Sequence, residues 1–167
     1  MAQNKKTVYH GTSVTAAANI RKEHHFRESR ADNEWLGWGV YFFAYEKHAQ
    51  RWIKNRGLSP GTVLAVQLEY RDEELLDLDD PAQLEALNHE IECLNRILRD
   101  KIVIKPGEVH ENWKRWCFSC NMYRKFHPEI GMISYTFPQH KKPGASHFPC
   151  NERQICVSKH DMITEIA

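Results

Sequence analysis

The chain has 167 residues, of which 41% are hydrophobic and 27% charged, and its formal net charge is +1. That length suits one domain with its own core, no apolar run is long enough to span a bilayer, and no signal-peptide pattern opens the chain. The five cysteines are odd in number and irregularly spaced, which argues against a disulfide framework and predicts one soluble cytoplasmic domain over residues 1–167.

Short strand and helix patterns alternate along the chain. Apolar runs predict strands at residues 7–9, 40–43, 63–68, 102–104, 130–137 and 155–157. Apolar residues at helical spacing predict helices at residues 16–23, 45–54 and 82–99. Ser13 or Thr15 can cap the first helix, and Asp80 followed by Pro81 is typical of a helix start. The run at residues 63–68 is nearly continuous, which is typical of a strand covered on both faces. The mixture predicts an α+β fold.

Two short segments carry residues that a hydrophobic core does not require. His10 and Gly11 follow an extended apolar pair near the start of the chain. Further on, two glycines frame Trp38 and lead into the predicted strand that holds Tyr41. A glycine at such a junction usually lets a ligand or another backbone approach closely. We therefore expect His10, Tyr41 and an acidic residue near the C-terminus to form a pocket for a flat, polar ligand.

The order Tyr9-His10-Gly11-Thr12, then Gly-x-Gly-Val-Tyr-Phe, an amphipathic helix and a late glutamate resembles the ADP-ribosyltransferase superfamily. The resemblance is closest to the diphtheria-toxin and poly(ADP-ribose) polymerase branch, in which a His, a Tyr and a Glu lie on three strands. Order and spacing fit over residues 8–52. The resemblance implies a split antiparallel β-sandwich with peripheral helices, and an NAD⁺-dependent mono-ADP-ribosyltransferase that consumes NAD⁺ as its co-substrate.

The resemblance also implies a role for each matched residue. His10 would bind the adenosine ribose, and Gly11 would offer its backbone to the nicotinamide amide. Tyr41 would stack on one face of the nicotinamide while Trp52 covers the other, an arrangement that suits a flat cationic ring. Thr12, which closes the first motif, joins these cofactor-binding residues. Each residue taken singly also fits a packing role, so the ordered set carries the assignment.

The family glutamate has two candidates in this chain. Glu152 and Gln154 both precede the predicted strand at residues 155–157, and a period of two puts them on one face. The resemblance implies a carboxylate that holds the nicotinamide ribose 2′-hydroxyl and supports an oxocarbenium-like transition state by its charge. We assign Glu152 to this catalytic position, beside His10 and Tyr41, and Gln154 to cofactor binding. With Gln154 at the catalytic position instead, the chain would be a non-catalytic module that binds NAD⁺ or nucleic acid.

Charge is segregated along the chain, with +5 in residues 1–66, −8 in residues 67–100, +6 in residues 101–160 and −2 in the last seven residues. In the second basic segment, cations alternate with aromatic residues, as in proteins that bind single-stranded nucleic acid. The candidate nucleic-acid-binding residues are Lys114, Arg115, Arg124, Lys125, Lys141 and Lys142. An amphipathic helix with its Trp and Phe side chains in the core explains the same pattern.

The superfamily includes small bacterial toxins of toxin–antitoxin and phage-defence systems, some of which modify nucleic acids. The resemblance therefore implies such a toxin, with RNA favoured over DNA as the acceptor and an antitoxin as a possible partner. The acidic helix at residues 82–99 is either a docking face for that partner or a solvated face. A protein-directed transferase or an enzyme similar to tRNA 2′-phosphotransferase is the alternative.

A rival reading of the cysteines is a metal site. Cys117 and Cys120 have the Cys-x-x-Cys spacing of zinc ligands, and His127 and Cys150 would complete a set of four. A single pair with irregular partners is a weak signal, and helices rich in aromatic residues often bury cysteines in their cores. We expect no metal at the NAD⁺ site.

Overall fold

A computed structural model describes residues 3–98, 104–139 and 150–167 of the chain. Its strands are β1 (Asn4–Ser13), β2 (Val40–Phe43), β3 (Gly61–Tyr70), β4 (Leu75–Asp77), β5 (Met132–Pro138), β6 (Asn151–Val157) and β7 (Ile163–Ile166). Its α-helices are α1 (Val14–Glu23), α2 (Glu46–Asn55), α3 (Pro81–Ile97) and α4 (Glu111–Phe126). Two short 3₁₀ turns, Asp72–Glu74 and His160–Met162, precede β4 and β7.

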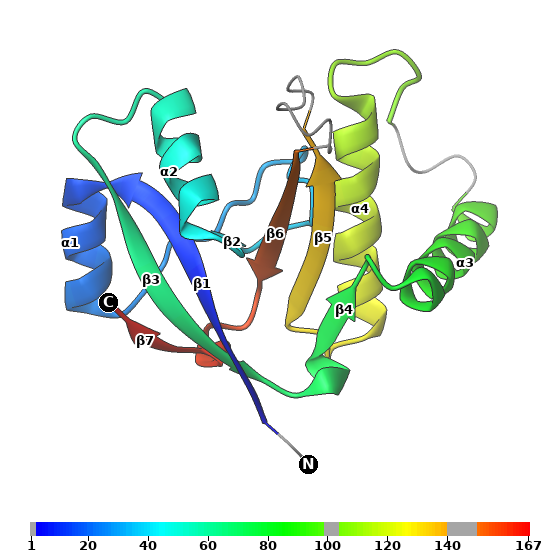
Figure 1. The fold of residues 1–167 in the computed structure, drawn as a ribbon. Helices are drawn as coiled ribbons and strands as arrows, with labels where there is room; N and C mark the ends of the chain where they lie inside the picture. Colours follow the sequence, from blue (N-terminus) through cyan, green and yellow to red (C-terminus); the bar gives the residue numbers. More distant parts are fainter. Residues whose placement is uncertain (1–2, 99–103, 140–149) are drawn as a thin grey trace.

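The strands form one hydrogen-bonded sheet in the order β4-β5-β6-β2-β1-β3-β7 (Figure 1). Neighbouring strands are antiparallel except β4 and β5, which run parallel. The α+β prediction is confirmed, but a wholly antiparallel sheet is wrong at this edge. At the centre, β1 and β2 share a single register pair, Tyr9 with Phe43. The sheet therefore consists of two strand groups, β1-β3-β7 and β2-β6-β5-β4, that meet at this pair.

Two apolar clusters hold the layers together. The first combines residues of both strand groups with α1, including Val8, Leu64 and Leu68 from one group and Phe42 and Ile155 from the other. One core is therefore shared by the two groups. The second cluster lies on the opposite face of β5 and β6, where α3 and α4 cover it, and contains Leu87, Cys120, Tyr123, Ile133 and Cys156.

Several helix starts follow the sequence signals. Ser13 caps α1, because its hydroxyl accepts a hydrogen bond of 3.1 Å from the backbone N–H of Ala16. Asp80 caps α3 in the same way through the N–H of Ala82, with Pro81 at the first helical position. The amphipathic helix named as the alternative to a nucleic-acid-binding segment is α4, whereas the sequence patterns gave no sign of β4 or β7. The strand expected at residues 102–104 lies almost wholly outside the described residues.

Two strand predictions need correction. The strand expected at residues 155–157 begins at Asn151, so Glu152 and Gln154 lie inside β6 rather than before it. The strand expected to be covered on both faces is buried on one face only, because its residues alternate between buried and half-buried positions along β3. The second face of β3 is packed less tightly because only part of it lies under α2.

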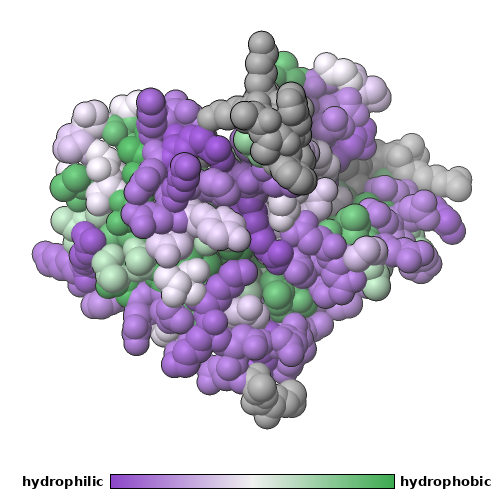
Figure 2. All heavy atoms as spheres, viewed as in Figure 1, coloured by the Kyte–Doolittle hydropathy of each residue, from purple (hydrophilic) through white to green (hydrophobic). Residues whose placement is uncertain are grey.

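The viewed side of the molecule is mainly hydrophilic, with hydrophobic residues in scattered patches (Figure 2). Among the described residues, none of the helices combines the length and the hydropathy that crossing a bilayer would demand.

Candidate functional site

The candidate site lies where the central sheet opens. After the pair between Tyr9 and Phe43, the antiparallel register would bring Gly11 opposite Tyr41, but β1 and β2 do not pair there. The backbone carbonyl of Tyr41 instead accepts a hydrogen bond of 2.8 Å from Nδ1 of His10. The His10 side chain thus takes the place of a strand partner and satisfies a carbonyl at the opening.

The backbone of Gly11 faces this opening. In antiparallel pairs, alternate residues direct both their N–H and C=O groups to the same neighbour. Val14 N–H donates to the Pro60 carbonyl at 3.2 Å, which extends the ladder between β1 and β3 through the even-numbered residues of β1. Ala167 N–H donates at 2.8 Å to the carbonyl of Ala65, the register partner of Tyr9. The odd-numbered residues of β3 therefore bond on the side away from β1, and its even-numbered residues bond to β1. The N–H and C=O of Gly11 therefore point away from β3, toward the side on which β2 has separated.

Gly11 is also a site of close approach. A Cβ at this position would lie 2.8 Å from the carbonyl oxygen of Ala49 and 3.3 Å from the ring of Trp52, both in α2. Only glycine lets α2 pack this closely against β1. The same residue therefore brings Trp52 to the opening and leaves a free stretch of backbone there.

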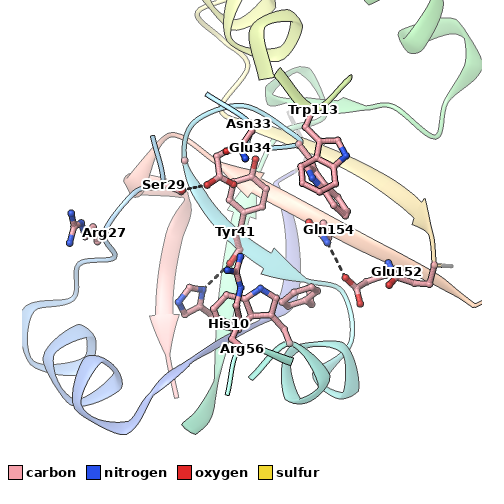
Figure 3. A pocket seen from close by; sticks show the side chains of 16 residues that line it. His10, Arg27, Ser29, Asn33, Glu34, Tyr41, Arg56, Trp113, Glu152 and Gln154 are labelled. Carbon is pink, nitrogen blue, oxygen red and sulfur yellow. Dashed lines mark hydrogen bonds between the residues drawn. The ribbon is translucent and has the colours of Figure 1, made fainter. Parts of the chain in front are cut away.

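A cavity of about 500 Å³ occupies the opening (Figure 3). This volume lies within the range of roughly 300–1,000 Å³ that is common for small-molecule sites. Six of the residues singled out from the sequence line it: His10, Gly11, Tyr41, Trp52, Glu152 and Gln154. Thr12, the remaining residue of the first motif, pairs with Thr62 of β3 and is not among the lining residues.

His10 is held as a neutral hydrogen-bond acceptor. Because the Tyr41 carbonyl only accepts, Nδ1 of His10 carries the hydrogen and Nε2 keeps its lone pair. Burial lowers the pKa of His10, against the smaller raising effect of the hydrogen bond to the Tyr41 carbonyl. The ring packs edge-on against Phe26 at 5.1 Å and Phe42 at 5.8 Å between centroids. A ligand group that bonds to Nε2 must therefore be a donor, such as a hydroxyl.

The Tyr41 hydroxyl holds the loop before β2, which contributes to the lining of the cavity. This hydroxyl accepts a hydrogen bond of 2.8 Å from Leu36 N–H and donates one of 2.7 Å to the Gly37 carbonyl. Gly37 has φ of +81°, which glycine adopts without strain. Burial, aided by the nearby Cys156 thiol, raises the pKa of Tyr41, so the phenol stays protonated. Because its hydroxyl is used in this way, the Tyr41 ring can offer a ligand only its face or edge.

Glu152 is one of two polar residues that are almost fully buried among the described residues, with 7% of its surface exposed. One carboxylate oxygen accepts a hydrogen bond of 2.6 Å from Arg51 of α2. The other accepts one of 2.9 Å from Nε2 of Gln154. The expected common face of Glu152 and Gln154 is therefore confirmed, and the glutamine holds the carboxylate in place.

Three arginines near the site were not identified from the sequence. Arg51 fixes Glu152, while Arg27 and Arg56 line the cavity. Neither Arg27 nor Arg56 forms an ion pair with another described residue, and the Arg56 guanidinium lies 5.5 Å from the ring centre of Trp52. Arginines in helices or polar loops have the pattern of solvated surface, so only the adjacency of Arg51 to Trp52 could have pointed to one of them.

The candidate nucleic-acid-binding residues have different surroundings. Lys114 pairs with Glu108 and, at 3.1 Å, with Asp32. Arg115 pairs with Glu111 one turn earlier in α4 at 2.9 Å.

Two further candidates lie at the C-terminal end of α4. Arg124 donates to the backbone carbonyls of Trp38 at 2.7 Å and Cys156 at 3.0 Å, so it ties α4 to the loop before β2 and to β6. Lys125 is exposed and has no ion pair with another described residue. Lys141 and Lys142 lie outside the described residues.

The cysteines of α4 are packed in the core. Cys117 and Cys120 are buried, and burial raises the pKa of Cys120 to about 12. His127 lies 2.7 Å from Glu90 and 3.2 Å from Glu129. No three His, Cys, Asp or Glu side chains gather as metal ligands within the described parts of the chain. The zinc alternative thus has no support from the arrangement of these residues.

Comparison with known proteins gives little further information. No protein-family model and no solved structure matches the chain. An alignment 84 positions long, which covers 47% of the chain, is 32% identical to an uncharacterized protein of Methanocaldococcus jannaschii. The matched stretch covers 39% of the length of that protein. The name of this relative gives no activity.

Proposed function

We propose that this chain is an NAD⁺-dependent mono-ADP-ribosyltransferase with the split-sheet fold of that superfamily, acting on nucleic acid. The observation that carries the proposal is the open edge of β1 at Gly11. It faces the same cavity as a buried carboxylate, a neutral histidine acceptor and two arginines. The division of the sheet at Tyr9 and Phe43, with one core shared by both strand groups, supports the fold.

The Gly11 edge is complementary to a carboxamide. On the same residue, a free N–H can donate to the carbonyl oxygen of an amide group and a free C=O can accept from its NH₂, as a second strand would. The nicotinamide of NAD⁺ carries such an amide on a flat cationic ring. The faces of Tyr41 and Trp52, which both line the cavity, suit a cation of this shape.

The remaining polar groups match the other parts of the dinucleotide. Nε2 of His10 accepts from a donor such as a ribose hydroxyl. Arg27 and Arg56 suit the diphosphate, because guanidinium groups form paired hydrogen bonds with phosphate oxygens. Two exposed arginines in a cavity of mixed aromatic and polar lining are thus explained by a ligand that has negative charges away from its reactive ring.

Glu152 supplies the fixed negative charge. NAD⁺ brings its own leaving group, since nicotinamide departs from the anomeric carbon of its ribose. A carboxylate held by Arg51 and Gln154 can accept from a ribose hydroxyl without first reorganising, and its charge favours positive charge that develops on the sugar. His10, neutral and bound to a backbone carbonyl, is a binding residue and not a general base.

The test is the release of nicotinamide from NAD⁺ by the full chain. Replacing Glu152 by Gln keeps the size but removes the charge, and it turns one of the two acceptor oxygens into an N–H donor. Because a preorganised electrostatic contact is worth roughly 10²–10³ in rate, we expect release to fall about 100-fold. Glu46→Gln, at an exposed position on α2, is the matched control and should release nicotinamide at the wild-type rate.

The outcomes separate the alternatives. Equal rates for the wild type and Glu152→Gln would remove Glu152 from the chemistry. NAD⁺ binding without any release, measured by calorimetry, would make the chain a binding module. Label from NAD⁺ that enters protein instead of nucleic acid would keep the transferase and change its acceptor.

A further inference from the structure

A second, smaller cavity lies between α3, α4 and β5. Its volume is about 200 Å³, below the usual range of roughly 300–1,000 Å³ for drug-sized ligands, and suits a single planar ring system. Aromatic rings and leucines form most of its lining, with two polar side chains. Among the described residues that line it, none is Asp, Glu, Lys, Arg or His. A phosphate or another charged group therefore has no partner here, whereas an uncharged ring does.

The aromatic rings are arranged around Phe137. The ring centre of Phe137 lies 4.6 Å from Trp35, 4.9 Å from Tyr135 and 6.0 Å from Trp116. Trp116 borders this cavity, yet 42% of its surface stays exposed. Trp116 therefore offers an exposed ring beside an apolar hollow. Stacking a planar ligand would bury it.

Two polar groups from different helices face the same cavity. Asn88 comes from α3 and Ser119 from α4, and neither side chain hydrogen-bonds to another described residue. A carboxamide offers two donors and one acceptor, and a hydroxyl offers both functions. Such groups recognise the edges of nucleobases, whose faces stack on aromatic rings.

The second cavity adjoins the first. Tyr135 and Phe137 are register partners of Gln154 and Glu152 on the neighbouring strand. Side chains of directly opposite residues point to the same face, with Cβ atoms about 4.5–5.5 Å apart. Trp35 lines both cavities. Phe137, which lines the smaller cavity, thus lies beside Glu152, which lines the larger one.

We propose that the smaller cavity is the acceptor site and receives one uncharged nucleobase of a single-stranded nucleic acid, an inference that rests on the proposed function. In the transfer, the bond between the nicotinamide nitrogen and the anomeric carbon breaks, and neutral nicotinamide leaves. A bond from a base nitrogen to that carbon forms, and the nitrogen loses its proton to solvent. Asn88 and Ser119 select the base, while Trp116 stacks on it.

The experiment measures two signals from the full chain with labelled NAD⁺: nicotinamide release without acceptor, and label in free nucleosides and short single-stranded oligonucleotides. We expect Trp116→Ala to lower base labelling about tenfold or more, since this is the size of effect that loss of one stacking ring produces. Nicotinamide release should stay unchanged, because Trp116 does not line the first cavity. Phe126→Ala, an exposed ring on the same helix outside both cavities, is the control.

A second variant tests the same proposal if Trp116→Ala does not fold. Asn88→Leu should alter the preference among the four bases, or lower labelling of all of them, while circular dichroism and nicotinamide release match the wild type. Labelling of oligonucleotides but not of nucleosides would show that the base is taken from a strand.

Three results would overturn the inference: labelling by Trp116→Ala equal to that of Phe126→Ala, label that enters protein alone, or equal loss of both signals in a folded variant. If the wild type releases no nicotinamide, the proposed function fails. The cavity is then tested by quenching of Trp fluorescence with nucleosides. Quenching that Trp116→Ala abolishes would support the base site, and its absence in the wild type would overturn it.

Discussion

Each face of β6 carries a contact between an arginine and a carboxylate, and the two faces differ in whether that contact borders a cavity. On one face, Glu152 is held by Arg51 and Gln154 and opens on the larger cavity. On the other face, Arg153 contacts Asp77 at 2.8 Å and Asp79 at 3.1 Å, and also donates to Ser134 at 2.9 Å. Both arginines are about three-quarters buried.

The comparison shows that burial of an ion pair does not by itself mark a functional site. Every named contact of Arg153 is internal and joins β6 to β5 and to the segment around the edge strand β4, so its role is structural. Glu152 has the same kind of partner, but its side chain also borders open space that is lined by aromatic and polar groups. A contact of this second kind can be shared with a ligand.

The largest effect on stability is expected for Arg153→Met. The change keeps most of the volume but leaves Asp77 and Asp79 without their cation, while Ser134 loses a donor. Removing one partner of a buried pair costs roughly 3–5 kcal/mol, and the partial exposure of these groups reduces this to about 2 kcal/mol. Urea unfolding measures it. Thr136→Val, which removes only a hydroxyl bonded to Asp79, should cost less. An unchanged midpoint would show that β4 does not depend on Arg153.

The complementary change on the first face is Arg51→Met. Here we expect a loss of roughly 1–2 kcal/mol in stability, less than for Arg153→Met, because a single carboxylate loses its cation and Glu152 keeps its bond to Gln154. Nicotinamide release should fall about tenfold, since the carboxylate is less firmly positioned. Arg51→Lys keeps the charge and should recover most of the rate. A large stability loss with an unchanged rate would make Arg51 a structural residue like Arg153.

The sequence predicted the residues of the cavity better than the contacts that hold them. His10, Gly11 and Tyr41 were found because a histidine and glycines interrupt strand patterns, which is a local signal. The open ladder between β1 and β2 is not local. It depends on the His10 side chain capping the Tyr41 carbonyl, 31 residues away.

The structural contacts were missed for related reasons. Arg153 stands between the two residues that drew attention, yet its partner Asp77 lies 76 residues earlier in the chain. The strands β4 and β7 have three and four residues, too few for a period of two to be recognised. In α4, aromatic and charged residues occur on every side, so the pattern did not distinguish a helix from a nucleic-acid-binding segment.

The smallest expected effect is on how the stability of the fold depends on pH, and it differs between the Arg153 side and the cavity side. Burial raises the pKa of Asp77, but hydrogen bonds from Arg153 and from the Asp79 N–H outweigh it, so the net pKa is lowered from 3.8. Its contribution to stability is therefore present above that value and is lost as the pH falls below it.

Burial lowers the pKa of His10 from 6.5. The unfolded chain then takes up this proton first, so stability on the cavity side declines as the pH falls below about 6.5.

Urea unfolding at closely spaced pH values would resolve these two ranges. His10→Gln keeps a donor for the Tyr41 carbonyl but does not titrate, so the variant should lose the part of the pH dependence that begins below about 6.5 and comes from this residue. It should keep the decline at lower pH, to which Asp77 on the Arg153 side contributes. NAD⁺ binding by the wild type should weaken over the same upper range, since protonation converts Nε2 of His10 from an acceptor into a donor. A His10→Gln profile identical to the wild type would mean that the pKa of His10 is the same in the folded and the unfolded chain, and that the cavity side does not respond to pH through this residue.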